Sequence, residues 1–197
     1  MRITDNLIND IENAPDWFFD AINKEPSECV IENQKGDLSY SKWNSDSENK
    51  NLLILIHGTG AHKRWWYPIA PHFTKNANVI AVDLPGMGDS GFREKYSIKD
   101  FGQCIISIIE KEKSDMLIDN VFIVGHSLGG QVAAYVASEE KELVSSLIMI
   151  DTFIRPPDWD PSQHEGGPLR MIKYYPDKTT ILKRFRLLPE QECLNDW

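Results

Sequence analysis

Cysteine is scarce in this sequence, which excludes a fold held together by disulfides. Only three cysteines occur among the 197 residues, namely Cys29, Cys104 and Cys193. They lie too far apart to form the closely spaced pairs that metal-binding and redox motifs need. Disulfide scaffolds are typical of short secreted chains, whereas a few scattered cysteines fit a reducing compartment. We therefore expect a soluble, cytoplasmic protein.

Long hydrophobic runs are missing as well. The longest uninterrupted runs, such as Leu52 to Ile56, have the length of a single β-strand, whereas a helix needs about 20 apolar residues to cross a bilayer. The first residues turn acidic at Asp5 and lack the apolar stretch of a secretory signal. The sequence therefore predicts no contact with a membrane.

Positive charge is in short supply. Lysine and arginine number 21 against 30 acidic residues, so the formal net charge is -9. The densest basic cluster, Lys183 with Arg184 and Arg186, is short. Because an acidic surface repels a phosphate backbone, we exclude nucleic acid as a partner.

What remains is the composition of an ordinary globular domain. Hydrophobic residues make up 41% and charged residues 26% of the chain, as is typical of folded proteins, and the length suits one domain. Short apolar runs alternate with segments of helical periodicity. The expected strands are 29–33, 38–43, 52–56, 79–82, 121–124 and 147–150, and the expected helices lie within 6–24, 65–73, 97–109 and 131–138. This alternation predicts an α/β fold with a parallel sheet.

The strongest motif is Gly125-His126-Ser127-Leu128-Gly129, which directly follows an expected strand and precedes an expected helix. This is the context of a nucleophile elbow, a sharp turn that presents a serine hydroxyl clear of the sheet. Side chains at Gly125 and Gly129 would clash in such a turn, which explains both glycines. Ser127 is therefore the candidate catalytic nucleophile.

Two further motifs follow the preceding strands. His57-Gly58-Thr59-Gly60 comes after the first buried strand, where the N–H of Thr59 would pair with that of Leu128 to form an oxyanion hole. The segment 83–90, Asp-Leu-Pro-Gly-Met-Gly-Asp-Ser, follows the next strand and is dense in turn residues. We interpret it as architectural.

Together these motifs resemble the α/β-hydrolase superfamily, in the branch with D-x-P-G-x-G-x-S and G-H-S-x-G-G signatures, over roughly residues 28 to 152. The resemblance implies a three-layer fold with a mostly parallel sheet between flanking helices. It also implies a Ser–His–acid mechanism that passes through an acyl-enzyme and needs no metal or organic cofactor. A partial hydrolase core over 1–152 and the beginning of a helical cap over 153–197 are then expected.

One departure from the family pattern concerns the catalytic base. In the family, the acid and then the histidine follow the nucleophile, but only His164 follows Ser127, in a segment rich in proline and glycine. Asp151 could be the acid, although a carboxylate that caps a strand end is the simpler interpretation. We therefore expect a truncated chain with an incomplete sheet, whose base and acid lie beyond Trp197 and which has little activity of its own.

Two functions are compatible with these observations. The leading one is hydrolysis of a carboxylic ester, or of a related small-molecule acyl substrate such as a lactone or thioester. The alternative is a non-catalytic binding protein that keeps the fold, which the missing histidine favours. A serine at the elbow argues against epoxide hydrolase and dehalogenase chemistry. Cleavage of carbon–carbon or peptide bonds, perhydrolysis and the oligomeric state stay open.

Overall fold

The computed structural model describes residues 14–44, 49–154, 176–177 and 180. Of these, residues Trp17–Ile154 belong to one compact unit. It contains all the strands and helices discussed below, except for Asp16, the first residue of the first helix. Three expectations fall outside the described residues: the cap beyond Ile154, apart from the few positions near 180, His164 within that cap, and the helical pattern before residue 14.

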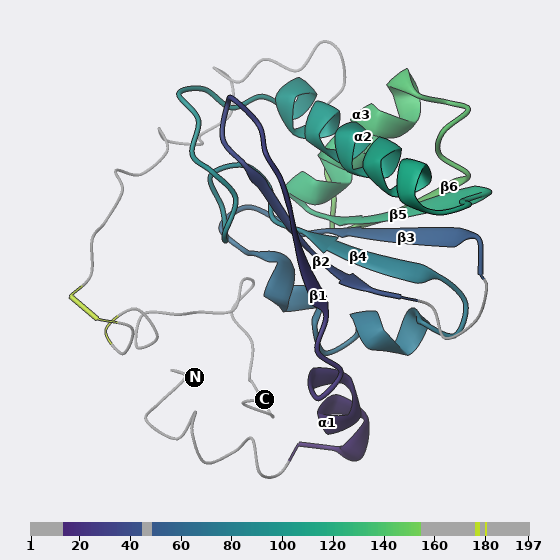
Figure 1. The fold of residues 1–197 in the computed structure, drawn as a ribbon. Coiled ribbons are helices and arrows are strands. Elements are labelled where there is room, and N and C mark those ends of the chain that lie inside the picture. The colour runs from purple at the N-terminus through teal and green to yellow at the C-terminus, as the bar shows by residue number, and fades with distance from the viewer. Residues whose placement is uncertain (1–13, 45–48, 155–175, 178–179, 181–197) are drawn as a thin grey trace. The chain divides into compact units, whose positions relative to one another are not determined.

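A six-stranded sheet forms the centre of the unit, in the order β1-β2-β4-β3-β5-β6 (Figure 1). β1 and β2 form an antiparallel hairpin, and β2 is antiparallel to β4. The pairs β3–β4, β3–β5 and β5–β6 are parallel. The strands are β1 (Ser27–Ile31), β2 (Leu38–Trp43), β3 (Asn51–Ile56), β4 (Asn78–Val82), β5 (Asn120–His126) and β6 (Ser146–Ile150). The mostly parallel sheet predicted from the sequence is confirmed.

The α-helices are α1 (Asp16–Ile22), α2 (Ile98–Asp115) and α3 (Leu128–Glu139), and α2 and α3 cover one face of the sheet (Figure 1). α2 begins where the sequence predicts it, because the Ser97 hydroxyl accepts a hydrogen bond from the N–H of Asp100 at 3.1 Å. α3 begins at Leu128, directly after Ser127 and three residues earlier than its apolar periodicity indicates.

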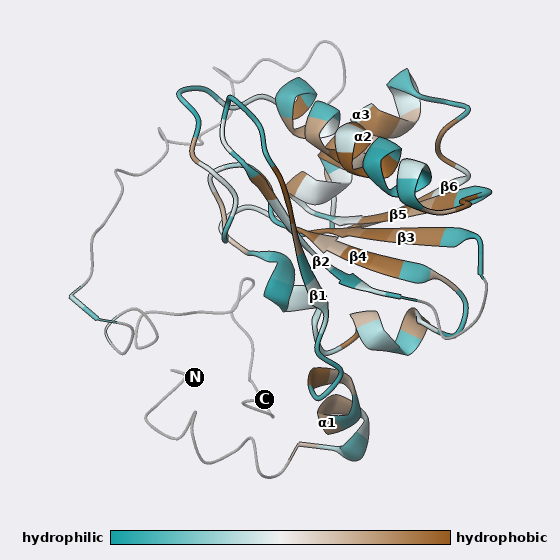
Figure 2. Cartoon of the chain, viewed as in Figure 1, coloured by the Kyte–Doolittle hydropathy of each residue, from teal (hydrophilic) through white to brown (hydrophobic). Residues whose placement is uncertain are grey.

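Two apolar cores lie on opposite faces of the sheet, because neighbouring side chains on a strand point to opposite sides. On β3, Leu52, Ile54 and Ile56 join the core beneath α2 and α3. Leu53 and Leu55 belong to the other core, together with Trp66. The central strands are correspondingly hydrophobic along almost their whole length (Figure 2), as parallel strands buried on both faces are.

The second face is covered differently from the prediction of one helix over 65–73. Two short 3-10 helices, η2 (Lys63–Trp66) and η3 (Ala70–Phe73), occupy this segment. Pro68 and Pro71 have no N–H to donate and their rings obstruct the preceding turn, so a continuous α-helix cannot form. Trp66 and Ala70 are buried, whereas Ile69 and Phe73, which the helical pattern places on the same face, are exposed.

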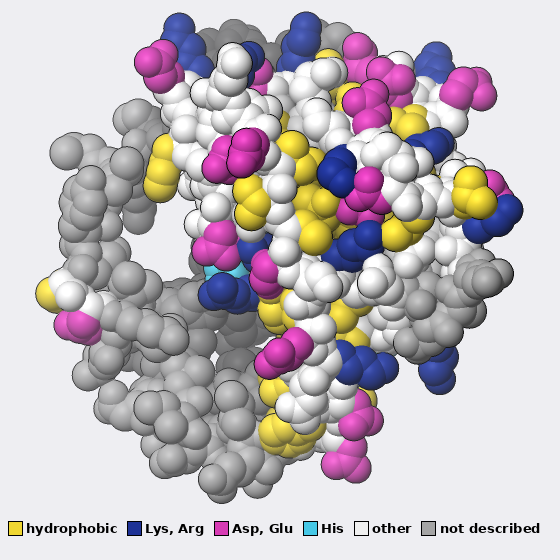
Figure 3. Space-filling model, in the orientation of Figure 1, with side chains coloured by type: hydrophobic (Ala, Val, Ile, Leu, Met, Phe, Trp, Pro, Cys, Tyr) yellow, Lys and Arg dark blue, Asp and Glu magenta, His cyan; other side chains and the backbone are white. Residues whose placement is uncertain are grey.

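β6 is an edge strand of the sheet within the described part of the chain. β6 has β5 as its partner within the described part of the chain, and Ile148, Met149 and Ile150 are exposed. Elsewhere, acidic and basic side chains are interspersed on the visible face (Figure 3). No helix among the described residues has the length and apolar character needed to cross a membrane.

Candidate active site

Ser127 lies at the junction of β5 and α3 in a backbone conformation that ordinary residues avoid. Its φ of 51° and ψ of -115° place it in strained positive-φ space. The two flanking glycines are required by close approach: a Cβ at Gly125 would overlap the carbonyl of Gly129, and one at Gly129 would overlap the carbonyl of Ile56. The sharp strand-helix turn predicted around Ser127 is confirmed, and the Ser127 side chain is partly exposed. The role of Ser127 as nucleophile stays a prediction.

Hydrogen bonds join the turn at Ser127 to the end of β6. The N–H of Ser127 donates to the carbonyl of Ile150 at 2.9 Å. The Thr152 hydroxyl lies within hydrogen-bond distance of the carbonyls of Ile150, at 3.0 Å, and Ser127, at 3.3 Å. Between Ile150 and Thr152, Asp151 has a φ of 46°, a second strained backbone. The Asp151 side chain is exposed and has no hydrogen-bond partner among the described residues. Its role as a catalytic acid stays a prediction.

The loop after β3 lies directly against the elbow. A methyl group added at Gly58 would meet Nδ1 of His126 at 2.7 Å and Cβ of Ser127 at 3.2 Å. Within the described part of the chain, the N–H groups of Thr59 and Leu128 donate to no acceptor. The structure thus brings the two segments together with both donors free, which is the condition for an oxyanion hole. The role of the two amides stays a prediction.

No histidine among residues 14–44 and 49–154 makes a hydrogen bond to Ser127. His57 is buried, and its Nε2 accepts from the N–H of Leu84 at 3.1 Å. Its Nδ1 therefore carries the proton and donates to the carbonyl of Gly58 at 2.7 Å. Burial lowers the pKa of the His57 imidazole. His57 is therefore a neutral link between the loops after β3 and β4.

A neutral buried histidine makes the fold sensitive to acid. In the unfolded chain, His57 becomes protonated as the pH falls below its ordinary pKa of 6.5. In the folded protein its pKa is lower, so it stays neutral to a more acidic pH. The free energy of unfolding is therefore highest above pH 6.5 and decreases as the pH falls below it. Between pH 7 and 5.5 we expect a loss of about 1 kcal/mol from this residue. Urea unfolding at a series of pH values measures it. The loss should be smaller in His57→Gln and unchanged in the exposed control His62→Gln; equal slopes in all three proteins would contradict the assignment.

The two tryptophans after the first loop have separate roles. Trp66 is 5% exposed and belongs to the apolar core. Trp65 is half-exposed, and its ring packs edge-to-face on His126 at a centroid distance of 4.5 Å. Nδ1 of His126 is buried and has no hydrogen-bond partner in the described part of the chain. Trp66 therefore packs in the core, whereas Trp65 lies beside the elbow.

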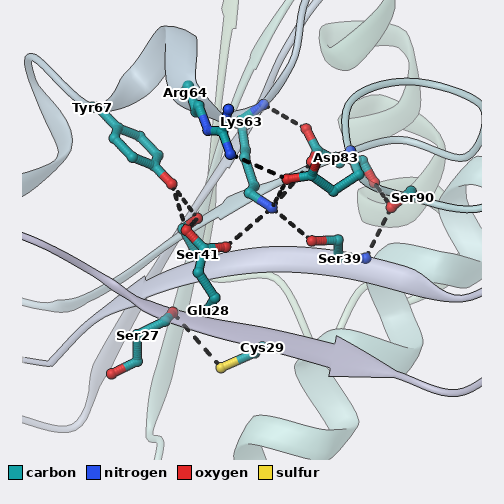
Figure 4. Close-up of polar contacts among 11 residues, drawn as sticks. Ser27, Glu28, Cys29, Ser39, Ser41, Lys63, Arg64, Tyr67, Asp83 and Ser90 are labelled. Carbon is teal, nitrogen blue, oxygen red and sulfur yellow. Dashed lines mark hydrogen bonds and ion pairs between the residues drawn. The ribbon is translucent and has the colours of Figure 1, made fainter.

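A buried lysine, which the sequence analysis missed, joins the loops behind the elbow (Figure 4). Lys63 is 1% exposed, and its Nζ donates to Ser39 Oγ at 2.6 Å and to Asp89 Oδ2 at 2.9 Å. It also forms ion pairs with Glu28 at 3.1 Å and with buried Asp83 at 3.3 Å. In addition, the backbone N–H of Lys63 donates to Asp83 Oδ1 at 2.6 Å. No periodicity or motif marks a lysine as buried, so nothing in the sequence indicated this cluster.

The positive charge of Lys63 and the acidic groups around it stabilise one another in their charged forms. Burial alone would lower the pKa of the Lys63 ammonium, but the hydrogen bonds to Asp89 and Glu28 and the charge of Asp83 raise it overall. Burial would likewise raise the pKa of Glu28, yet bonds from Tyr67, Lys63 and Ser41 lower it. The hydrogen bond from Lys63 also lowers the pKa of Asp89. Lys63, Glu28 and Asp89 are therefore charged near neutral pH. Their contacts and that of Asp83 hold the segment after β3 to the one after β4.

The segment 83–90 is architectural, as interpreted from its turn residues. The Ser90 hydroxyl donates to the carbonyl of Asp83 at 2.7 Å and accepts from the N–H of Ser39 at 2.9 Å. Gly88 has a φ of 57°, and a Cβ there would overlap the Asp83 carboxylate. Gly88 thus leaves room for the Asp83 carboxylate, which pairs with Lys63.

Comparison with known proteins agrees with this geometry. A family model described as alpha/beta hydrolase fold matches residues 51–183, which include all three motifs. The chain belongs to this family. Its six-stranded sheet and strained elbow are the features expected of an α/β hydrolase.

Relatives of this α/β hydrolase include enzymes that act on esters. A pimeloyl-[acyl-carrier protein] methyl ester esterase of Pseudoalteromonas atlantica is 31% identical over 129 residues, which cover 61% of this chain and 47% of that protein. Among solved structures, a bacterial membrane phospholipase A is 28% identical with a TM-score of 0.58, covering 69% of this chain and 43% of that one. The epoxide hydrolase CorEH is 25% identical with a TM-score of 0.60, covering 70% and 47%. The chain thus spans about half the length of these proteins.

Proposed function

We propose that the chain carries the nucleophile and the oxyanion hole of a serine hydrolase for carboxylic esters or related acyl compounds. The observation that carries the proposal is Ser127, strained at a φ of 51°. Nearby, the N–H groups of Thr59 and Leu128 have no acceptor among the described residues. Strain of this kind persists only where the surrounding structure enforces it, and it concentrates at functional sites.

In the proposed reaction, Ser127 Oγ attacks the carbonyl carbon of the substrate while its proton passes to a base. The carbonyl oxygen becomes negative, and the N–H groups of Thr59 and Leu128 donate to it. Collapse of this intermediate expels the alcohol and leaves an acyl group on Ser127. Water then attacks the acyl-enzyme, the acid is released and Ser127 regains its proton. The chemistry requires neither a metal nor an organic cofactor.

The substrate class follows from the relatives. The curated relative is named as a methyl ester esterase and the structural relative as a phospholipase A, and both names denote cleavage of an ester. We therefore place a small-molecule carboxylic ester ahead of a lactone, a thioester or a peptide. We also infer cytoplasmic action, since Cys29 and Cys104 are free thiols.

A second candidate is a binding protein that keeps the hydrolase fold without turnover. The observation that favours it is the absence, among the described residues, of any histidine hydrogen-bonded to Ser127. A general base has to come within about 3 Å of the hydroxyl. Covalent chemistry at Ser127 separates this candidate from the hydrolase.

The test is reaction with p-nitrophenyl acetate, followed by nitrophenolate release and mass spectrometry of the peptide that contains Ser127. We expect slow acetylation of Ser127, no faster than about 10³–10⁴-fold over water, because the oxyanion donors act without a base. Ser127→Ala should abolish it, and the exposed helix control Ser138→Ala should retain it.

Two results would contradict parts of this account. Absence of acetyl-Ser127 would reject the hydrolase and leave the binding protein. Turnover near the ordinary enzyme rate of about 10 s⁻¹, lost in Ser127→Ala, would show that the chain contains a working base, and His164 would then be replaced first.

A further inference from the structure

We propose that a small molecule bearing a phosphate group binds between the β1–β2 turn and the first turns of α2, with Arg93 as its principal ligand. Two cavities meet there, of about 620 Å³ and 550 Å³. Lys35, Arg93 and Asp100 line both of them. Pockets of a few hundred cubic ångströms are the size that small-molecule ligands occupy. The proposal is independent of the chemistry at Ser127.

Arg93 is left almost without acceptors by the protein. Its guanidinium makes one hydrogen bond within the described residues, from Nη2 to Cys104 Sγ at 3.1 Å. Its Nε is buried and has no partner there, and no carboxylate pairs with it. Burial raises the pKa of the Cys104 thiol, so the sulfur is neutral and a weak acceptor. A cation with five donors and one weak acceptor is poised for an anionic ligand.

Other cations surround Arg93. Lys35 and Lys99 line the smaller cavity, and among the described lining residues Asp100 is its one carboxylate. Lys95 lines the larger one, together with Glu94. The three lysines take part in no ion pair within the described part of the chain. A local excess of positive charge therefore exists in a protein whose net charge is -9.

The acid that faces both cavities is already engaged. Asp100 accepts a hydrogen bond from the Ser97 hydroxyl as part of the cap that begins α2. The positive end of the α2 dipole lies at this turn and favours an anion. Several cations around one arginine suit a phosphate dianion better than a carboxylate, because a dianion gains from each additional charge.

The walls of the site are held in place. The N–H of Gly91 donates to the carbonyl of Asp37 at 2.8 Å, which joins the segment before Arg93 to the β1–β2 turn. The backbone N–H of Arg93 donates to Tyr96 Oη at 2.9 Å. Gly36, with a φ of 112°, allows the two segments to approach closely. A site built in advance loses less entropy when a ligand binds.

The experiment is a calorimetric titration of the full chain with phenyl phosphate, inorganic phosphate and, as a blank, phenol. We expect saturable binding of phenyl phosphate with a dissociation constant at or below about 1 mM, as a few charge-assisted hydrogen bonds provide, and no binding of phenol. Binding equal to that of inorganic phosphate would support the site and identify free phosphate as its ligand. Tighter binding of phenyl phosphate would support an organic phosphate.

Variants locate the binding. Arg93→Gln should weaken it at least about tenfold, the equivalent of one charge-assisted hydrogen bond, while the exposed-helix variant Lys99→Gln should weaken it about threefold without disturbing the fold. Lys141→Gln, an exposed lysine elsewhere, is the matched control. The proposal would be overturned if binding of phenyl phosphate did not saturate by about 10 mM. It would also be overturned if Lys99→Gln, Lys141→Gln and the unaltered chain bound with equal affinity. Both outcomes can be read even if Arg93→Gln does not fold.

Discussion

Replacing Lys63 with methionine is expected to lower the free energy of unfolding by about 3–5 kcal/mol, because it leaves a buried charge without its partner. Asp83 is 2% exposed and keeps its carboxylate beside the cavity that the ammonium vacates. Asp89 and Glu28 lose the same cation, so three acids would then repel one another. Urea unfolding at pH 7 measures the loss, which is large beside the 5–15 kcal/mol of a typical domain.

A surface lysine provides the control. Lys50 pairs with Asp119 at 3.4 Å, and both side chains are more than half exposed. Lys50→Met should therefore change stability by no more than about 1 kcal/mol. The double variant Lys63→Met/Asp83→Asn should recover part of the loss, since it removes a charge that lacks a partner. Equal stability of Lys63→Met and Lys50→Met would show that the cluster does not hold the two loops together.

Replacing Gly129 with alanine should damage both the fold and the candidate site. The added Cβ would overlap the carbonyl of Ile56 on one side and lie 2.6 Å from the carbonyl of His57. These are backbone atoms at the end of a central strand, so they cannot turn away as a side chain would. We expect a loss of about 3 kcal/mol or more, at the upper end of overpacking costs. The displaced helix start should also slow acetylation of Ser127 by moving the N–H of Leu128.

Gly102→Ala is the matched control for this prediction. It is also a glycine within a helix, but its added Cβ would meet the ring of Tyr135, a side chain at a half-buried position. Alanine improves helix propensity by about 1 kcal/mol over glycine, which offsets the shift of the ring. We expect a net change within about 1 kcal/mol. If both variants lost the same stability, backbone crowding at the elbow would not be the cause.

The strands and motifs were readable from the sequence because their signals are local. An apolar run such as Leu52 to Ile56 is buried in any α/β arrangement, and all six expected strands are present. Gly125 and Gly129 lie within five residues of one another, and both are required because a Cβ at either position would overlap backbone atoms. Over 65–73 the helical periodicity is misleading, because Pro68 and Pro71 interrupt the hydrogen bonds of a continuous α-helix.

Composition and local pattern, then, were sufficient to determine the α/β class, the order of the strands along the chain and the sharp turn at Ser127. Only the tertiary structure decided that Lys63 is buried among three carboxylates and that His57 is neutral and bonded to the next loop. It also decided that Arg93 pairs with no carboxylate in the part of the chain that the structure describes. These properties depend on groups far apart in the sequence. The free energy of a charge depends on the atoms that surround it in space, and residue order alone does not specify them.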